Sequence, residues 1–289
     1  MAPTASGRGR KHMSITLPEL TPTQESLFLT LGISALDSRL PRPFLGDPMA
    51  DEILKASGYD LRRFALFRSE RLDPKTKVFS GAVRAKHEDE VVARFVAAHP
   101  DAVVLDLGTG LDTRVFRTDP PPTVDWYDID FPTVIDLRRQ LVPEREGVHL
   151  VAADLTEPGW LADIPGDRPT MIVHNGLVPF LSMGDYQSLL LRLTRHFQSG
   201  EMAHNSYTRP AVWTFKRVFG DVPGIGFNDP RAPERWVPGL KLVEEIFNVR
   251  SPEVAEIATS PAWRLMLGAI ASSTILSRHL EAAVLHYRF

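Results

Sequence analysis

The chain has 289 residues, 43% of them hydrophobic and 24% charged, with a formal net charge of -3 and no cysteine. This composition excludes bulk disorder and a fibrous structure, and the length allows a sizeable core. The weak acidic charge argues against nucleic acid, so we expect a small-molecule or peptide partner. The absence of cysteine excludes disulfides, thiolate metal sites and a thiol nucleophile, which fits a cytoplasmic protein.

The N-terminal part of the chain predicts a tail followed by helices. Residues 1–15 are polar and basic, without an apolar segment after them, so we expect a disordered tail and no signal peptide. Leucine-rich stretches at 25–40 and 51–67 predict helices within a helical cap over residues 16–83. No later stretch approaches the roughly 20 apolar residues of a membrane span, so we expect no membrane association.

From residue 84 to 289 the pattern predicts one α/β domain. A helix over 85–100 places Val91, Val92, Phe95 and Val96 on one face. Short apolar runs then alternate with helical stretches, which is typical of a parallel sheet. The five runs are 102–107, 123–130, 148–154, 170–175 and 201–206.

The helix expected between the last two of these runs covers residues 182–197. It is amphipathic, and Ser182 is its expected N-cap, with Asp185 completing a capping box. The apolar stripe consists of Tyr186, Leu189, Leu190, Leu193 and Phe197.

The C-terminal third is less regular. Residues 208–238 are rich in proline, glycine and aromatic residues and predict an irregular lid. After it we expect a strand at 239–247, a buried helix at 261–276 and a last strand at 282–289. The lid aromatics favour core packing, with contact to a hydrophobic ligand as the alternative; they are Trp213, Phe215, Phe219, Phe227 and Trp236.

A glycine turn follows the first strand, in the segment Asp106-Leu107-Gly108-Thr109-Gly110. Glycines there allow a tight turn and a close approach to a ligand. A dinucleotide fingerprint requires a third small residue at the position of Thr113. A Rossmann oxidoreductase that binds NAD(P) is therefore a weaker alternative.

An acid that accepts hydrogen bonds from ribose is expected about 20 residues after the glycines, at the end of the second strand. Asp130 lies there, and Asp128 shares its face of the strand. We favour Asp130 because it is nearer the carboxyl end. The alternative is that Asp130 caps the helix beginning at Pro132.

The segments VVLDLGTGLDTR and WYDIDFPTVIDLRRQLVP resemble the leucine carboxyl methyltransferase family, in particular its bacterial tetracenomycin-type polyketide O-methyltransferases. The resemblance covers about residues 80–200. It implies a Rossmann-like, seven-stranded class I methyltransferase fold and the cofactor S-adenosylmethionine, with S-adenosylhomocysteine as product.

The resemblance also assigns cofactor contacts by position. Arg84 would bind the cofactor carboxylate, for which a guanidinium fork is suited; its alternative is a surface salt bridge. Asp130 would bind the ribose, and Asp154 with Leu155 would flank the adenine, although Asp154 is also a candidate helix cap. The complete expected set is Arg84, Asp106, Gly108, Gly110, Asp130, Asp154, Leu155 and Asn175. We expect Asp112 and Arg114, also in the motif, to form a structural ion pair.

Two positions depart from the family pattern. Asn175 stands where the family usually has glutamate, and Asn205 where bacterial members have aspartate. Both put the ordinary substrate in doubt, and they leave open a protein that binds the cofactor without methyl transfer.

The expected reaction is methylation of a carboxylate on a small polyketide-like natural product or a peptide. A carboxylate is ionised at neutral pH and needs no base, whereas a phenol with a pKa near 10 benefits from one. His204 and Tyr207 are the candidate bases, with a core or pocket-wall role as the alternative for each. No metal motif is present, and we expect a metal-free monomer or homodimer.

Overall fold

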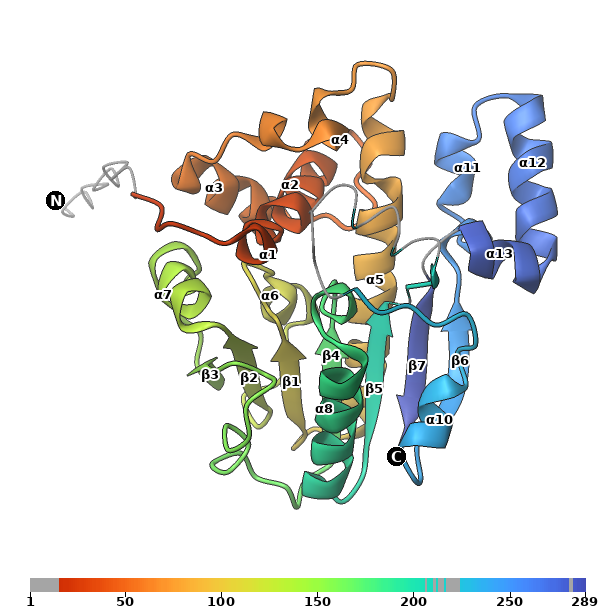
Figure 1. Ribbon diagram of the computed structural model, residues 1–289. Helices are drawn as coiled ribbons and strands as arrows, with labels where there is room; N and C mark the ends of the chain where they lie inside the picture. Colours follow the sequence, from red (N-terminus) through yellow and green to blue (C-terminus); the bar gives the residue numbers. More distant parts are fainter. Residues whose placement is uncertain (1–15, 206, 210–211, 213–215, 217–223, 281–282) are drawn as a thin grey trace, which may run out of the picture.

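The computed structural model describes residues 16–289 except 206, 210–211, 213–215, 217–223 and 281–282. Its centre is a seven-stranded sheet in the order β3-β2-β1-β4-β5-β7-β6 (Figure 1). All neighbouring strands are parallel except β7, which is antiparallel to both β5 and β6. The strands are β1 Val103–Leu107, β2 Asp125–Asp130, β3 Val148–Ala152, β4 Thr170–His174, β5 Gly200–Asn205, β6 Lys241–Ile246 and β7 Val284–Arg288. The expected seven-stranded α/β sheet is thus confirmed.

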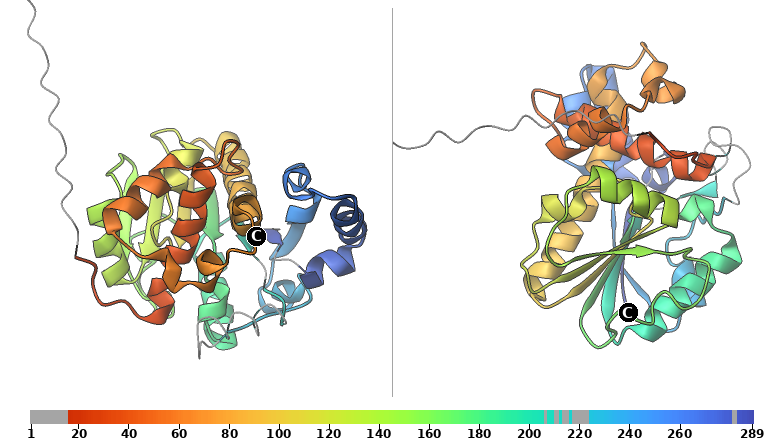
Figure 2. Two further views of the ribbon diagram at one scale, coloured as in Figure 1. Left: turned by 90° about the horizontal axis from the view of Figure 1, so that it is seen from above. Right: turned by 90° about the vertical axis from the view of Figure 1, so that its left-hand side faces the viewer.

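Helices cover both faces of this sheet (Figure 2). One face packs against α8 (Met183–His196) and α10 (Ala232–Trp236), and the other against α5 (Pro74–Ala98). The predicted N-cap of α8 is present, because the Ser182 hydroxyl accepts a hydrogen bond from the Asp185 N–H at 3.1 Å. The predicted capping box is not formed, since the Asp185 carboxylate accepts from the Ser182 hydroxyl instead of the Ser182 N–H. The predicted apolar stripe of α8 is buried as expected.

Helix α5 is longer than the sequence pattern predicts. It begins at Pro74, where the carboxylate of Asp73 accepts from the N–H of Thr76 at 3.1 Å. The four residues of the expected apolar face, from Val91 to Val96, are buried against the sheet. The expected boundary between residues 83 and 84 lies inside this helix, so α5 contributes to both the cap and the sheet layer.

The N-terminal cap lies over the carboxyl ends of the strands (Figure 1). Its elements are α1 Pro22–Glu25, α2 Leu27–Ser38, α3 Pro48–Ser57, η1 Leu61–Arg63 and α4 Ala65–Arg68. The helix pattern at 51–67 is interrupted after Gly58, which has a left-handed φ of 63° and ends α3. Asp37 is fully buried and accepts the backbone N–H groups of residues 44, 45 and 46, which fixes the loop between α2 and α3.

The remaining elements connect these layers. Helix α6 is Arg114–Thr118 and contacts α5, and helix α7 is Pro132–Leu141 and contacts β2 and β3. The short helix η2 covers Val178–Phe180 after β4, and η3 covers Asn248–Arg250 after β6.

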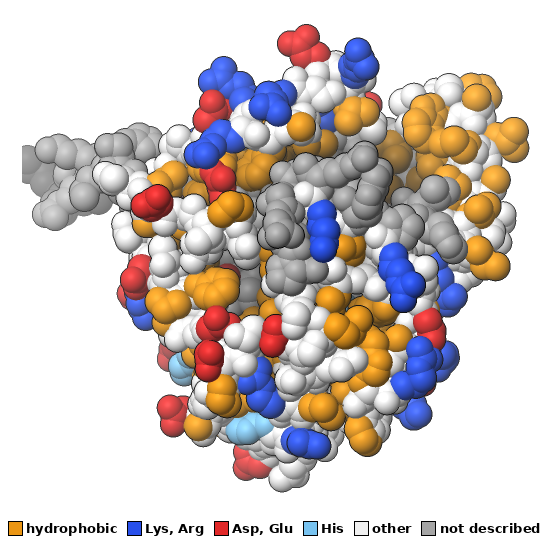
Figure 3. Space-filling model, in the orientation of Figure 1, with side chains coloured by type: hydrophobic (Ala, Val, Ile, Leu, Met, Phe, Trp, Pro, Cys, Tyr) orange, Lys and Arg blue, Asp and Glu red, His pale blue; other side chains and the backbone are white. Residues whose placement is uncertain are grey.

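The predicted buried helix at 261–276 is wrong in two respects. It is divided into α12 (Pro261–Ser272) and α13 (Thr274–Leu280), and no residue of α12 is buried. Leu265 is 78% exposed and Ile275 is 68% exposed. The segment, with α11 (Val254–Ile257), lies in an excursion between β6 and β7, so many of its apolar side chains remain on the surface (Figure 3). Leu267 and Ile270 of α12 are partly buried against the core.

The predicted lid at 208–238 falls partly outside the described residues, as do its aromatics Trp213, Phe215 and Phe219. The other two, Phe227 and Trp236, pack on Tyr186 with ring centroids 6.4 Å away in each case. They therefore belong to the core, as the sequence favoured. Within the described part of the chain, no helix is long and apolar enough to span a membrane.

Candidate active site

The glycine turn follows β1 directly and is held against β2. Gly108 and Gly110 have φ values of 66° and 53°, the left-handed region that favours glycine. The N–H of Gly108 donates to the carbonyl of Ile129 at 2.8 Å. The turn thus takes the conformation that the sequence predicts, at the carboxyl edge of the sheet.

The two aspartates that strand alternation could not separate have different surroundings. Asp130 accepts the N–H of Gly110 at 2.8 Å on one oxygen and the N–H of Phe131 at 2.7 Å on the other. Phe131 is itself the N-cap residue of α7, which has no side-chain cap, so Asp130 does not cap this helix. Burial raises the pKa of Asp130 to about 6. Two of about four acceptor positions on this carboxylate remain for a ligand.

Asp128, by contrast, is a structural residue. It is 1% exposed and accepts two bonds from Arg138, at 2.9 and 2.6 Å. Its other oxygen accepts from Trp126 Nε1 at 3.0 Å and from the Thr109 hydroxyl at 3.2 Å. Arg138 also donates to the carbonyl of Asp112 at 2.6 Å. The Asp128–Arg138 pair therefore holds the glycine loop in place through the backbone carbonyl of Asp112.

A cleft opens between the cap and the edge of the sheet. Its lining includes Thr30, Ser34, Asp47, Arg84, Asp112 and Asn175. Arg84 forms no salt bridge within the described residues, and its buried Nε has no hydrogen-bond partner there. The buried Oδ1 of Asn175 likewise has none. Because buried polar groups are normally bonded, two unpartnered groups facing one cleft indicate a ligand site.

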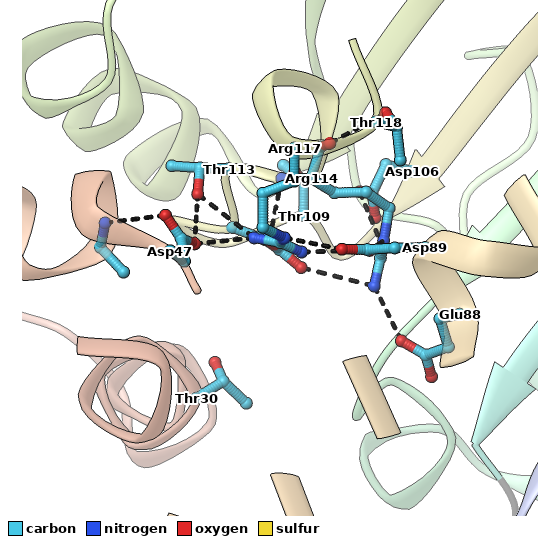
Figure 4. Close-up of polar contacts among 12 residues, drawn as sticks. Thr30, Asp47, Glu88, Asp89, Asp106, Thr109, Thr113, Arg114, Arg117 and Thr118 are labelled. Carbon is cyan, nitrogen blue, oxygen red and sulfur yellow. Dashed lines mark hydrogen bonds and ion pairs between the residues drawn. The ribbon is translucent and has the colours of Figure 1, made fainter. Parts of the chain in front are cut away.

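A network of buried acidic and basic side chains holds the wall of this cleft (Figure 4). Arg114 is 1% exposed and contacts Glu88 at 2.7 Å, Asp89 at 2.8 Å and Asp106 at 3.1 Å. Its contact with Asp112 at 3.5 Å confirms the predicted structural ion pair. Asp106 is thus engaged by Arg114, and burial raises the pKa of its carboxyl to about 7. A cofactor contact of Asp106 stays a prediction.

Arg117 extends this network to the cap. It contacts Asp47 at 2.7 Å, Asp89 at 2.7 Å and Asp112 at 2.8 Å. Burial opposes ionisation of Asp112, but Arg117 and Arg114 outweigh it and hold the pKa of Asp112 well below its usual range. Three separate segments of the chain, cap, α5 and glycine loop, therefore meet on one guanidinium.

The predicted adenine contacts lie at the end of β3. The N–H of Ala153 donates to the carbonyl of Asp130 at 2.9 Å, which brings this segment beside the predicted ribose site. Asp154 is exposed and accepts the N–H and the hydroxyl of Thr156 at 2.9 and 2.8 Å, closing a turn. Leu155 is buried. Contact of either residue with adenine stays a prediction.

His204 lies in the core on the face of the sheet that packs against α8. It is fully buried, with Nε2 3.2 Å from the Tyr186 hydroxyl and Nδ1 3.2 Å from the carbonyl of Asn205. Its ring stacks on His174 with centroids 4.5 Å apart and on Tyr287 at 5.5 Å. Burial lowers the pKa of His204 to about 4. This geometry favours the core role over that of a base.

Tyr207 follows β5 and packs against the same core cluster, and its hydroxyl interacts with Arg84 and Asn205. Burial raises the pKa of its hydroxyl, and the positive charge of Arg84 and a hydrogen bond from Asn205 oppose this shift. A phenol held in its neutral form is a poor base. A catalytic role of Tyr207 stays a prediction.

The sequence did not identify the cap residues of the cleft or Glu88. Thr30 and Ser34 are ordinary residues of an amphipathic helix, with no motif around them. Within the described residues no group of three or more His, Asp or Glu side chains is placed to hold a metal. The expectation of a metal-free site stays a prediction.

The chain shares its fold with one class of enzymes and its sequence with one family of that class. A structure described as a putative methyltransferase from Thermobifida fusca aligns with a TM-score of 0.55 over 90% of this chain and 94% of its own, at 16% identity. The fold is therefore that of the class I S-adenosylmethionine-dependent methyltransferases. The model of the leucine carboxyl methyltransferase family matches residues 28–194, and the chain belongs to this family.

Two relatives illustrate the relationship. The tetracenomycin polyketide synthesis O-methyltransferase TcmP of Streptomyces glaucescens is 39% identical, covering 84% of this chain and 90% of its own length. The S-adenosyl-L-methionine-dependent methyltransferase dpfgK of Gibberella zeae is 32% identical over 79% of this chain and 83% of its own. The protein is thus a methyltransferase of the TcmP-type branch, and the oxidoreductase alternative is wrong.

Proposed function

We propose that this methyltransferase transfers the methyl group of S-adenosylmethionine to a carboxylate oxygen of a small, polyketide-like acceptor. The observation that carries the proposal is the cleft beneath the cap, where Arg84 and Asn175 present unpartnered polar atoms to one space. The polyketide class is supported by the name of the relative TcmP.

The residues present fit the cofactor. Arg84 would hold its carboxylate, the free acceptor positions of Asp130 would bind the ribose hydroxyls, and Asp154 would lie at the adenine. The cofactor supplies an electrophilic methyl group bonded to a sulfonium. The contribution of the chain is to align the acceptor with that group and to exclude water.

The surroundings of the candidate bases favour a carboxylate acceptor over a phenol. Both ring nitrogens of His204 are engaged and the ring is enclosed by Tyr186, His174 and Tyr287. The hydroxyl of Tyr207 has a raised pKa. Since an ionised carboxylate needs no base, the reaction requires neither residue.

We also propose that the cap over residues 16–83 covers the acceptor. Thr30 and Ser34 of α2 line the cleft opposite Arg84, so an acceptor entering the cleft would contact the cap. The lining also includes Leu31, Ile33 and Leu111, and such a partly apolar lining suits a small hydrophobic ligand.

The test uses cofactor carrying a labelled methyl group. The enzyme is given an aromatic polyketide acid, the same compound with its acid blocked as an amide, and the acid with its phenols blocked. Methyl esters release labelled methanol in mild alkali, whereas aryl methyl ethers retain the label.

We expect transfer to both compounds that carry a free acid, and complete release of label in alkali. Transfer only to compounds with a free phenol, giving label that is stable in alkali, would refute the carboxylate proposal. The mechanism would then require a base. Failure of all three to accept label, with cofactor binding intact, would restrict the acceptor to another class.

A further inference from the structure

A cluster of buried and half-buried polar residues lies between α5 and the ends of β4 and β5. It consists of Arg84, Glu88, Asn175 and Asn205, which we call the strand-end cluster. Arg84 and Glu88 are four residues apart on α5 and so share one face of the helix. Asn205 alternates with His204 along β5, so its side chain is on the α5 face while His204 faces α8. Its Oδ1 accepts the N–H of Gly176 at 2.8 Å, which joins the ends of both strands.

Glu88 is the least accounted-for member of this cluster. Its side chain is fully buried, and Oε2 accepts from Arg114 at 2.7 Å. Its other oxygen, Oε1, has no hydrogen-bond partner within the described residues. Arg114 thus accounts for one oxygen of this carboxylate, and the other oxygen remains without a hydrogen-bond partner among the described residues.

Glu88 is fully buried and does not itself line the cleft, but it neighbours a residue that does. Glu88 interacts electrostatically with Arg84, one helical turn away, and with the Tyr207 hydroxyl. Arg84 and Asn175 line the cleft, and each has an unpartnered buried atom. The cluster therefore offers a guanidinium donor and, beside it, two free acceptors, Oε1 of Glu88 and Oδ1 of Asn175.

A guanidinium next to a free carboxylate oxygen and a free amide oxygen is complementary to a zwitterion, because a zwitterion carries both a carboxylate and an ammonium group. A ligand whose carboxylate pairs with Arg84 would place an adjacent ammonium at the two acceptors. We propose that Glu88 is a further cofactor-binding residue, whose Oε1 accepts a hydrogen bond from the α-ammonium of the methionine end, with Asn175 assisting. This inference rests on the proposed placement of the cofactor carboxylate at Arg84.

The charges around Glu88 make its binding role measurable. Burial raises the pKa of Glu88 to about 8, and Arg114 and Arg84 oppose this shift. The titratable and charged groups that face it are Arg84 and Asp89 on its own helix, Arg114 of α6, Asp112 of the glycine loop and Tyr207 after β5. An ammonium at Oε1 favours the ionised carboxylate, so binding at pH 7 releases a proton.

The experiment compares Glu88→Gln with the matched control Glu90→Gln, an exposed glutamate on the same helix. Calorimetry measures the affinity for S-adenosylhomocysteine and for its analogue lacking the α-amino group. We expect Glu88→Gln to weaken S-adenosylhomocysteine binding about tenfold, the effect of one charge-assisted hydrogen bond, and to leave the analogue unaffected. Glu90→Gln should change neither affinity.

Proton release provides the second measurement and needs only the unmodified protein. Titration in two buffers of different ionisation enthalpy should show net release with S-adenosylhomocysteine at pH 7, and none with the desamino analogue. Equal release with both ligands, or equal weakening of both by Glu88→Gln, would overturn the proposal and leave Glu88 structural. Failure of the unmodified protein to bind S-adenosylhomocysteine would instead contradict the proposed function.

Discussion

At the scale of single residues, the number of hydrogen bonds that a carboxylate already accepts distinguishes two aspartates that strand alternation does not. Asp128 and Asp130 are two residues apart on one strand face, yet Asp128 is saturated by Arg138, Trp126 and Thr109. Asp130 accepts only two backbone N–H groups and has positions left for a ligand. Counting partners on a carboxylate thus distinguishes a saturated structural residue from one that keeps acceptor positions for a ligand.

This difference predicts that removing Asp130 affects ligand binding, whereas removing Asp128 affects stability. Asp130→Ala should weaken S-adenosylhomocysteine binding by about 1–3 kcal/mol, the range for a lost bond to a polar or charged group, and Arg84→Ala should do the same. Asp128→Ala should instead lower the free energy of unfolding by about 3–5 kcal/mol, because Arg138 is left as an unpaired buried charge. Calorimetry and urea denaturation measure the two effects. Unchanged affinity in Asp130→Ala would remove that residue from the site.

At the scale of the element, the ends of β4 and β5 present buried histidines to α8, whereas Asn205 of β5 lies on the opposite face, toward α5. His174 and His204 stack on the α8 face, and both ring nitrogens of His174 are buried without partners in the described part of the chain. Burial lowers the pKa of His174 well below its usual value and that of His204 to about 4. The folded protein therefore keeps both rings neutral.

These rings should make the fold sensitive to acid. Between about pH 6.5, where histidine in the unfolded chain titrates, and about pH 4, the unfolded state binds protons that the folded state does not. The contribution of His204 to stability is therefore full above pH 6.5 and falls with decreasing pH, by about 3 kcal/mol. The buried carboxyls of Glu88, Asp106 and Asp130, whose pKa values are raised, change stability in the opposite direction, so the prediction concerns the difference between two proteins. Urea unfolding measured across this range should show that the stability of the unmodified protein falls relative to that of His204→Gln as the pH decreases. An identical slope in both proteins would contradict the assignment.

Helix α12 shows the limit of pattern reading at this scale. Its apolar residues resemble those of a buried helix, but burial depends on whether a partner layer lies opposite. We expect Leu265→Ser to change the free energy of unfolding by less than about 0.5 kcal/mol, since its side chain is exposed. Leu189→Ala in α8, a buried position of the same residue type, should cost about 2–5 kcal/mol. A large loss in Leu265→Ser would show that α12 is covered in solution.

Local signals in the sequence account for much of the fold and part of the site. Short apolar runs that alternate with helical stretches identified the first five strands. The Ser182 cap identified α8, and the glycine turn located the carboxyl end of β1. The missing parts depend on contacts between distant segments. Glu88 is unremarkable in sequence, and its role depends on Arg114 and on the strand ends. Thr30 reaches the cleft only because the cap folds back over the sheet.

At the scale of the molecule, Arg117 joins the cap, α5 and the glycine loop. Arg117→Gln should lower the free energy of unfolding by about 3–5 kcal/mol, because Asp47 and Asp89 lose a buried partner. Amide exchange should quicken first in α2 and α3. The control is Arg139→Gln, whose pair with Asp136 is about half exposed and should contribute about 0–1 kcal/mol. Equal effects of both changes would mean that the cap is held by apolar packing alone.

The antiparallel strand β7 has a consequence for synthesis. It lies between β5 and β6, and its pairing continues to Phe289, whose N–H and carbonyl both bond to Gly200. Both neighbours precede it in the chain, so each keeps an open edge until β7 has left the ribosome. Domains fold as their segments leave the ribosome, and exposed edges in that interval favour aggregation. A nascent chain whose β7 is still inside the ribosome would therefore display an unfinished sheet, however completely β1 to β4 had folded.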